Sequence, residues 1–366
     1  MKFAYKVSPH VKAKVSTLNI LNTVLLSLLF VTIWSIVVQY LNFGVDYAIR
    51  ASIIVFTACI AAVLTSIIFY LVQASGEKSA SFGERLQSAF SKTRNGAPLV
   101  TALVLALSLP VGMPIYGVIV ATVFAEFIGK LIFGGFGSNL FNPAAIGIVI
   151  AGLAFGSAIV YPDMYAGEAP MDYIARHHNW RLTEALGWQF ICRYCSLGHI
   201  FFGSIRGAIG ETARPAILIA FVFLAYRRII DWVVPVVYVG TIFVATLIFA
   251  SHLCVGLWYP VLHIFTGSLI FGAVFMATDP VTTPINRQGR ILFAIFLAMI
   301  TLIIRFNSTH IEAMAFSILI MNMFVPLIDR KTANITNKNK LAKAAVICIA
   351  FVGAIGFALG LSIMLG

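Results

Sequence analysis

The sequence predicts an all-α integral membrane protein with about 10–11 transmembrane helices. Its 366 residues are 60% hydrophobic and 10% charged, and the mean hydropathy is +0.97. Soluble domains carry about 25% charged residues, so these values exclude a soluble fold for most of the chain. The long apolar runs are also separated by short breaks that contain glycine, proline or charged residues, as a bundle of membrane-spanning helices requires.

Each expected helix is an apolar run between two such breaks. The first run, residues 20–41, is too long for a secretory signal and lacks a small-residue cleavage site, so we expect it to be retained as a helix. The expected helices cover residues 18–42, 51–74, 98–112, 114–134, 145–160, 213–229, 233–251, 260–277, 289–305, 310–328 and 344–365.

The order of these helices predicts two sets of five. The stretches 98–110 and 264–280 each lie third in their set, and both join an apolar run to a terminal proline. The first set would begin inside and the second outside, so the halves would form an inverted repeat with broken helices near its centre. The expected segments are a cytoplasmic N-terminal segment (1–17), a first membrane repeat (18–160), an external loop (161–212), a second membrane repeat (213–328), and a basic linker with an extra C-terminal helix (329–366).

The basic residues predict the orientation. With a cytoplasmic N-terminus, 17 of the 25 Lys and Arg residues fall in inside segments and 7 in outside segments. This bias is typical of a multi-pass protein of the cell membrane, and it accounts for the net charge of +12. The basic residues are spread over separate loops, so we do not expect nucleic acid as a partner.

The segment Phe275-Met-Ala-Thr-Asp-Pro-Val-Thr-Thr-Pro-Ile285 breaks a helix at bilayer depth. Lipid tolerates such a break only where the freed backbone lines a cavity or a cofactor. Thr278, Thr282 and Thr283 could donate hydrogen bonds to a cofactor or coordinate water, or they could only satisfy the broken backbone. An acid within a span often marks an ion path or a cofactor site, which makes Asp279 a candidate for both.

Asp279 also has a purely structural interpretation. It could cap the following turn, or pair with Arg287 or Arg290. A comparable irregular segment, Gly134-Gly-Phe-Gly-Ser-Asn-Leu-Phe-Asn-Pro-Ala-Ala145, combines glycines with Asn139, Asn142 and a proline. We expect this segment, too, to line a protein cavity.

With Gly210-Glu-Thr-Ala213, these two segments closely resemble the RnfD/NqrB family, the flavin-carrying membrane subunits of Rnf and Na⁺-translocating NADH:quinone reductase complexes. The resemblance implies a five-plus-five helix architecture and a subunit of an oxidoreductase and ion translocase. Its function would be electron transfer between flavin, iron–sulfur and quinone partners, which could be coupled to Na⁺ or H⁺ movement. Other Rnf/Nqr-type subunits would be its partners.

The resemblance also implies FMN covalently bound to Thr212 through a phosphoester that an extracytoplasmic flavin transferase makes. The charge count places Thr212 outside, on the side of such an enzyme. Glycines such as Gly210 let backbone approach a phosphate, and a helix that begins at Ala213 offers it free N–H groups. Ser204 and Glu211 belong to the same motif, although Ala213 replaces the usual serine. By residue type alone, Thr212 would be an N-cap.

Further assignments remain open on the sequence alone. A second, non-covalent flavin is compatible with the resemblance. The further candidate cofactor-binding residues are Asn142, Thr278, Asp279, Thr282 and Thr283. Glu126 precedes Lys130 by four residues, which favours an ion pair. In a member of this family, Glu126 could instead belong to a cation route with Asp279 and Glu312.

Cys192 and Cys195, with scattered histidines, form only a weak metal signature, so we expect no metal. The inverted repeat and the Asn-Pro turn would also suit a urea-channel-like transporter or channel without a redox cofactor. A subunit that only scaffolds a flavoprotein is a third possibility.

Overall fold

The computed structural model describes residues 16–74, 81–159, 197–203, 207–252, 256–307 and 313–333, together with three glycines near the C-terminus. These residues are largely helical, and none of them lies in a β-strand. Apart from those three glycines, the expected helix 344–365 lies outside the described residues, and so does most of the expected external loop.

Five helices in the described part of the chain are long and apolar enough to cross a membrane. They are α1 (Thr17–Phe43), α2 (Val45–Ala74), α11 (Val233–His252), α14 (Arg287–Asn307) and α15 (Ala313–Thr332). A sixth candidate is the pair α12 (Trp258–Phe265) and α13 (Leu269–Phe275), bent by 53° at a short break. The predicted all-α, multi-pass membrane fold is therefore confirmed, whereas the inverted repeat stays a prediction.

Several shorter apolar helices occupy the other predicted runs. They are α4 (Pro98–Ser108), α5 (Ile115–Glu126), which continues as the π-helical turn η1 (Phe127–Leu131), α6 (Pro143–Phe155), followed by the 3₁₀ turn η2 (Gly156–Ala158), and α10 (Arg214–Tyr226). Pro98, Pro143 and Pro215 lie in the first turns of their helices, where a missing N–H costs nothing. The prolines thus set where these helices begin.

The structure differs from the expected helices in four places. The run 260–277 was expected to form one helix, but the chain breaks at Thr266–Ser268, between α12 and α13. Helix α2 begins at Val45, six residues before the expected start. Helix α3 (Phe82–Gly96) was not expected because it is too polar for a search by apolar runs, and a short helix, α9 (Leu197–Phe202), precedes the Glu-Thr turn.

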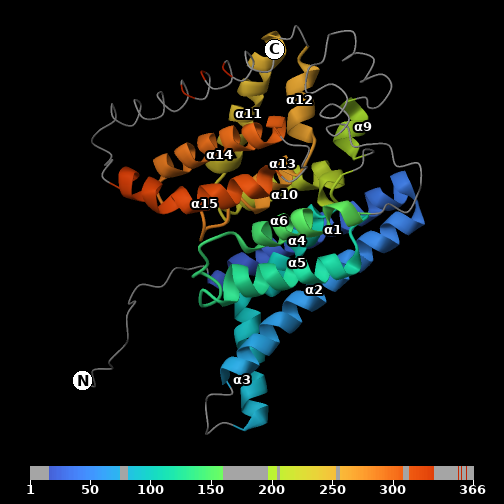
Figure 1. The fold of residues 1–366 in the computed structure, drawn as a ribbon, viewed down its shortest axis with the longest axis vertical. Helices are drawn as coiled ribbons and strands as arrows, with labels where there is room; N and C mark the ends of the chain where they lie inside the picture. Colours follow the sequence, from blue (N-terminus) through green and yellow to red (C-terminus); the bar gives the residue numbers. More distant parts are fainter. Residues whose placement is uncertain are drawn as a thin grey trace.

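Helices that are close in the sequence pack into groups, and these groups contact each other along two seams, α1 with α10 and α6 with α15 (Figure 1). Helices α2, α4, α5 and α6 pack together, as do α11, α14 and α15, while α1 packs on α10 and α15 on α6. Small residues permit the close approaches. A Cβ atom on Gly147 of α6 would lie 2.1 Å from Leu105 Cδ1 and 2.8 Å from the Ala121 carbonyl oxygen. The two seams place irregular segments from both halves of the chain in the interior.

Candidate functional site

The two irregular segments predicted to line a cavity meet in the structure. Asn142 is the N-cap of α6, where its Oδ1 accepts from the Ala145 amide at 3.2 Å. Its Nδ2 donates to the Met276 carbonyl at 3.1 Å. Asn322 of α15 then joins both segments, because its Oδ1 accepts from the Asn142 amide at 2.9 Å and its Nδ2 donates to the Thr282 carbonyl at 3.1 Å.

Replacing Asn322 by leucine should destabilise the protein by about 2–6 kcal/mol. The change leaves the Asn142 amide and the Thr282 carbonyl without these partners in the interior, and each unsatisfied group costs about 1–3 kcal/mol. Thermal or SDS-induced unfolding in detergent micelles would measure the loss. Asn95→Leu, at an exposed position on α3, is the matched control. Equal stability of the two variants would contradict the assigned role of Asn322.

A cavity of about 230 Å³ lies beside this junction. Its walls are mostly apolar side chains from α1, α4, α10 and α13. Its polar lining residues are Thr17, Thr101, Lys130, Asn139, Asn142, Thr278 and Asp279. Apolar walls with a few polar groups are typical of ligand pockets, whose volumes are usually about 300–1,000 Å³. The lining is therefore of the ligand-pocket type, although the cavity volume lies below this range.

Asp279 caps the turn that follows it. Its Oδ1 accepts from the Val281 amide at 3.3 Å, and its Oδ2 accepts from the Thr282 hydroxyl at 3.0 Å. The structural interpretation of this acid as a turn cap is thus confirmed. Its suggested pairing with an arginine is not what the structure shows, because Arg290 pairs with Asp231, in the loop between α10 and α11.

The Asp231–Arg290 pair has its own electrostatic consequence. Burial by itself would raise the pKa of Asp231, but the Val233 amide and the Arg290 guanidinium hold that pKa below its usual value. Arg287 lies over the Trp232 ring instead, with Cζ 5.8 Å from the ring centroid. The acid in the cavity wall is thus left without either of these arginines.

The three threonines around Asp279 differ in placement. Thr278 lines the cavity, and its hydroxyl donates to the Val274 carbonyl. The Thr283 hydroxyl donates to the Asp279 carbonyl. Thr282 and Thr283 are not part of the cavity lining, and in this conformation their hydroxyls satisfy the broken segment.

Glu126 and Lys130 form the predicted ion pair, and both are almost fully buried. Lys130 Nζ lies 2.7 and 2.9 Å from the two carboxylate oxygens, and it also donates to the Thr101 hydroxyl at 3.2 Å. The Ser66 hydroxyl donates to Glu126 Oε1 at 2.9 Å. The pair straddles the change from α5 to the π-helical turn η1, and such π-bulges frequently occur at functional sites. Glu312 lies outside the described residues.

The second site is the turn that contains Thr212. Residues Gly210–Ala213 form a 3₁₀ turn, η3, in which the fully buried Thr212 donates its hydroxyl to the Ile209 carbonyl at 2.8 Å. The N-cap of α10 is Ala213, without a side-chain hydrogen bond. The prediction that Thr212 is an N-cap is therefore wrong, because its hydroxyl acts as a donor to the preceding turn and the helix begins at Arg214.

Glu211 connects this turn to the break between α12 and α13. One carboxylate oxygen, Oε2, accepts from the Ala208 amide at 3.2 Å. The other, Oε1, accepts from Arg214 Nη2 at 3.1 Å and from the Gly267 amide. Arg214 in turn donates through Nε to the Phe265 carbonyl. Glu211 and Arg214, both buried, thus hold the Thr212 turn against the second half of the chain.

Arg305 supports the same break from α14. Its guanidinium donates to the His263 and Thr266 carbonyls, each at 2.7 Å, so it satisfies groups that the end of α12 leaves free. Gly267 has φ +72°, and a Cβ atom there would lie 2.4 Å from Arg305 Nη2. Sequence reasoning missed Arg214 and Arg305, although a charge at the end of an apolar run signals a site.

The first half of the chain holds the other side of the Thr212 turn. The Ile209 amide donates to the Leu109 carbonyl at 2.9 Å, and Ala208 forms an isolated bridge with Pro110. A Cβ atom on Gly210 would lie 3.0 Å from Leu107. The Thr212 turn is therefore held between the end of α4 and the start of α13. Ser204 lies outside the described residues.

The cavity and the Thr212 turn lie at opposite ends of α1 and α10. Thr17 of α1 lines the cavity, while Asn42, near the other end of α1, donates to the Gly203 carbonyl beside the Thr212 turn. On α10, Leu224 lines the cavity and lies twelve residues after Thr212. At 1.5 Å per residue, the two sites are separated by about 18 Å along the helix.

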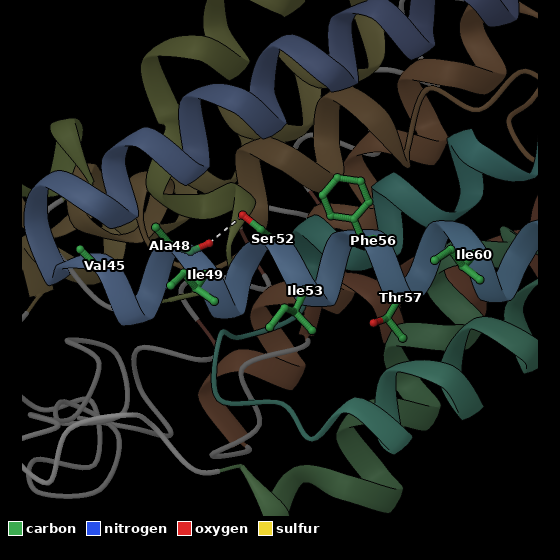
Figure 2. A pocket seen from close by; sticks show the side chains of 8 residues that line it. All are labelled: Val45, Ala48, Ile49, Ser52, Ile53, Phe56, Thr57 and Ile60. Carbon is green, nitrogen blue, oxygen red and sulfur yellow. Dashed lines mark hydrogen bonds between the residues drawn. The ribbon is translucent and has the colours of Figure 1, made fainter.

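A larger hollow on α2, of about 400 Å³, has a different character (Figure 2). Its eight lining residues all belong to one helix, and most are aliphatic. The Ser52 hydroxyl is satisfied by the Ala48 carbonyl at 2.8 Å. Exposed apolar side chains such as Phe56 and Ile60 are what a lipid-facing span requires, so we assign this hollow to the lipid surface.

Among the described residues, no group of three or more His, Cys, Asp or Glu side chains could hold a metal ion. Cys192 and Cys195 lie outside that part of the chain.

Comparison with known proteins identifies related sequences. The model of the NQR2, RnfD, RnfE family matches residues 4–338. The chain is 30% identical over 338 residues to a subunit of the proton-translocating ferredoxin:NAD(+) oxidoreductase complex of Clostridium ljungdahlii, covering 90% of this chain and 94% of the relative.

Two further relatives come from differently named complexes. A subunit of the Na(+)-translocating ferredoxin:NAD(+) oxidoreductase complex of Acetobacterium woodii is 29% identical over 349 residues, covering 92% of this chain and 97% of the relative. A subunit of the Na(+)-translocating NADH-quinone reductase of Chromohalobacter salexigens is 33% identical over 259 residues, covering 67% of this chain and 60% of the relative.

Proposed function

Because the chain belongs to the NQR2, RnfD, RnfE family, we propose that it is a membrane subunit of an oxidoreductase complex that couples electron transfer to ion translocation. The names of its relatives support this proposal, and they imply other subunits of the same complex as partners. The relatives are named for different ions, H⁺ and Na⁺, so their names do not select the ion for this chain. The sequence has no nucleotide-binding fingerprint, so NADH oxidation would belong to another subunit.

We propose that Thr212 carries covalent FMN. A phosphoester would form between Thr212 Oγ1 and the phosphorus of a flavin dinucleotide donor, while the nucleoside monophosphate leaves and the hydroxyl proton is released. The observation that supports this site best is the position of the turn, which both halves of the chain hold and beside which the buried Arg214 pairs with Glu211. Positive charge and helix N-termini favour a phosphate.

Attachment at Thr212 requires the turn to move. The side chain is fully buried, and its hydroxyl is occupied by the Ile209 carbonyl. A threonine hydroxyl can form a phosphoester. In this turn, however, the hydroxyl must first be released from the Ile209 carbonyl before an extracytoplasmic transferase can reach it. Glu211 and Arg214 would then orient the modified turn against the break between α12 and α13.

The cavity is the proposed site of a second, non-covalent flavin. Asn139, Asn142, Thr278, Asp279 and Lys130 supply polar atoms around apolar walls, which suits the edge and the faces of a planar ring. Flavin supplies the ability to accept electrons in pairs and release them singly. With one site at each end of α10, the protein would relay electrons along its spans towards a partner such as quinone.

For ions, we propose a route that uses the acids beside the cavity. Glu126 and Asp279 lie close to the cavity, since Lys130, the partner of Glu126, and Asp279 both line it. Buried acids in spans usually mark ion or proton paths. Glu312 is the third candidate on this route.

The decisive experiment is in-gel flavin fluorescence. The wild type, co-expressed with an exported flavin transferase, should give a fluorescent band on a denaturing gel, and Thr212→Val should give none. Thr246→Val, at another fully buried threonine, is the matched control and should remain fluorescent. A dark wild-type band, with the transferase active on another substrate, would refute the covalent assignment. Solute flux through flavin-free protein would then favour the channel alternative.

A further inference from the structure

Helix α3 (Phe82–Gly96) carries apolar and basic side chains that neither proposed site uses. It is amphipathic, and its buried residues, Ala89, Thr93 and Gly96, lie on one face. The helix packs on α2, where Lys92 Nζ lies 5.9 Å from the centroid of the Tyr70 ring. If α3 were only a connector in water, we would expect no exposed apolar side chains beyond this buried face.

Next to its buried face, α3 presents apolar side chains at every fourth position. These are Phe82, Leu86 and Phe90, and the two phenylalanines are 74% and 52% exposed. Single exposed apolar residues are common on protein surfaces and need no explanation. Two exposed aromatic residues on one side of a short polar helix, however, form a strip along the helix axis that is largely uncovered by the described residues.

The charges of α3 are unequal. The helix contains three basic residues, Arg85, Lys92 and Arg94, and one acid, Glu84. Glu84 closes a capping box with Ser81, since Glu84 Oε2 accepts from the Ser81 amide at 2.8 Å and the Glu84 amide donates to Ser81 Oγ at 3.3 Å. Its carboxylate is therefore occupied at the helix start, and the remainder of the helix is basic.

Helix α3 lies beside the last part of a long span. Helix α2 has 30 residues and is about 45 Å long, which exceeds the hydrocarbon thickness of about 30 Å. Helix α3 follows the end of α2 and runs crosswise to α4, α5 and α6 (Figure 1). A basic amphipathic helix in this orientation has the properties of one that lies in the membrane interface.

We propose that α3 is an interfacial helix that inserts Phe82 and Phe90 into the lipid headgroup region, while its basic residues contact anionic phospholipids. The occupant of this surface is the membrane itself, because the helix begins where a span ends and its excess charge is complementary to anionic headgroups. The helix would fix the level at which α2 leaves the bilayer.

Spin-label accessibility would test this proposal. Single cysteines would replace Phe82, Phe90, Ser88 and Ser91 in the full chain, with the five native cysteines changed to alanine. The labelled proteins would be placed in nanodiscs of phosphatidylcholine and phosphatidylglycerol, and collisions with oxygen and with a water-soluble nickel chelate would be compared. Ser88 and Ser91 are exposed positions on the polar face of the same helix and serve as matched controls.

The labels at Phe82 and Phe90 should show an oxygen-to-nickel collision ratio several-fold higher than the labels at Ser88 and Ser91. Equal nickel accessibility at all four positions would overturn the proposal, because the helix would then lie in water. Low collision with both reagents at Phe82 and Phe90 would also overturn it, since a protein surface would then cover the strip. Helical content and monodisperse elution of each variant would establish that it is folded.

Discussion

Glu126→Ala should destabilise the folded protein by about 3–5 kcal/mol. Lys130 is 2% exposed, and in the described structure its carboxylate partner is Glu126, so the change leaves an ammonium group buried without its counter-charge. Breaking a buried pair from one side carries a cost of this size. Glu84→Ala, at the exposed start of α3, should cost only about 1 kcal/mol because the loss is that of a capping interaction. SDS-induced unfolding in micelles would compare the two.

A double variant separates the charge of this pair from its shape. Glu126→Gln with Lys130→Met removes both charges and retains most of the side-chain volume. We therefore expect the free energy of unfolding of this double variant to lie within about 1–2 kcal/mol of the wild-type value. If Glu126→Ala were no less stable than Glu84→Ala, the pair would not be a structural element. A stable double variant would also allow ion translocation to be measured without the acid, which tests the proposed route apart from folding.

The parts of the fold that the sequence predicted well are those that depend on local chemistry. Helices α1, α11 and α14 agree with the expected ranges within about two residues because apolar runs end at glycine, proline or charged residues. Helix α3 escaped prediction because its polar composition gives no membrane signal, although Ser81 and Glu84 form a recognisable capping box.

The break between α12 and α13 depends on residues far away in the sequence. Gly267 lies between Thr266 and Ser268 inside a largely apolar run, and such a small-residue triplet does not by itself identify a break in a membrane helix. The broken conformation is stabilised by Glu211, which accepts from the Gly267 amide, and by Arg305, which donates to the His263 and Thr266 carbonyls. Such long-range partners cannot be read from a single sequence.

In the candidate site, too, local features were predictable from the sequence and long-range contacts were not. The Asn-Pro and Asp-Pro breaks were expected to line a cavity, and Asn142, Thr278 and Asp279 do lie on one cavity wall. The link between these breaks could not be predicted, since it is made by Asn322, a polar residue within the apolar part of α15. Nothing in the local sequence indicates that the Thr212 hydroxyl is buried, because its burial results from packing by both halves of the chain.

Gly203→Ala should be strongly destabilising, by about 2–5 kcal/mol. Gly203 has φ +83°, and a Cβ atom there would lie 1.9 Å from the Thr212 carbonyl oxygen. A left-handed backbone costs an alanine about 1–2 kcal/mol, and the overlap with a backbone atom adds a strain of about 1–3 kcal/mol. The neighbouring atom cannot rotate away, because Thr212 belongs to the turn that Glu211 holds in place.

Gly44→Ala is the control that isolates the steric part of this cost. Gly44 has φ +95° and ψ −178°, a region that essentially only glycine adopts, but a Cβ atom there would meet nothing within 4 Å, so the variant should lose only backbone strain of about 1–3 kcal/mol. The difference between the two variants, measured by thermal unfolding in the same detergent, reports how tightly Gly203 is packed on the Thr212 turn. If both lost the same stability, the turn would have room to shift, and the hydroxyl of Thr212 could be released for modification without disturbing the segment before it.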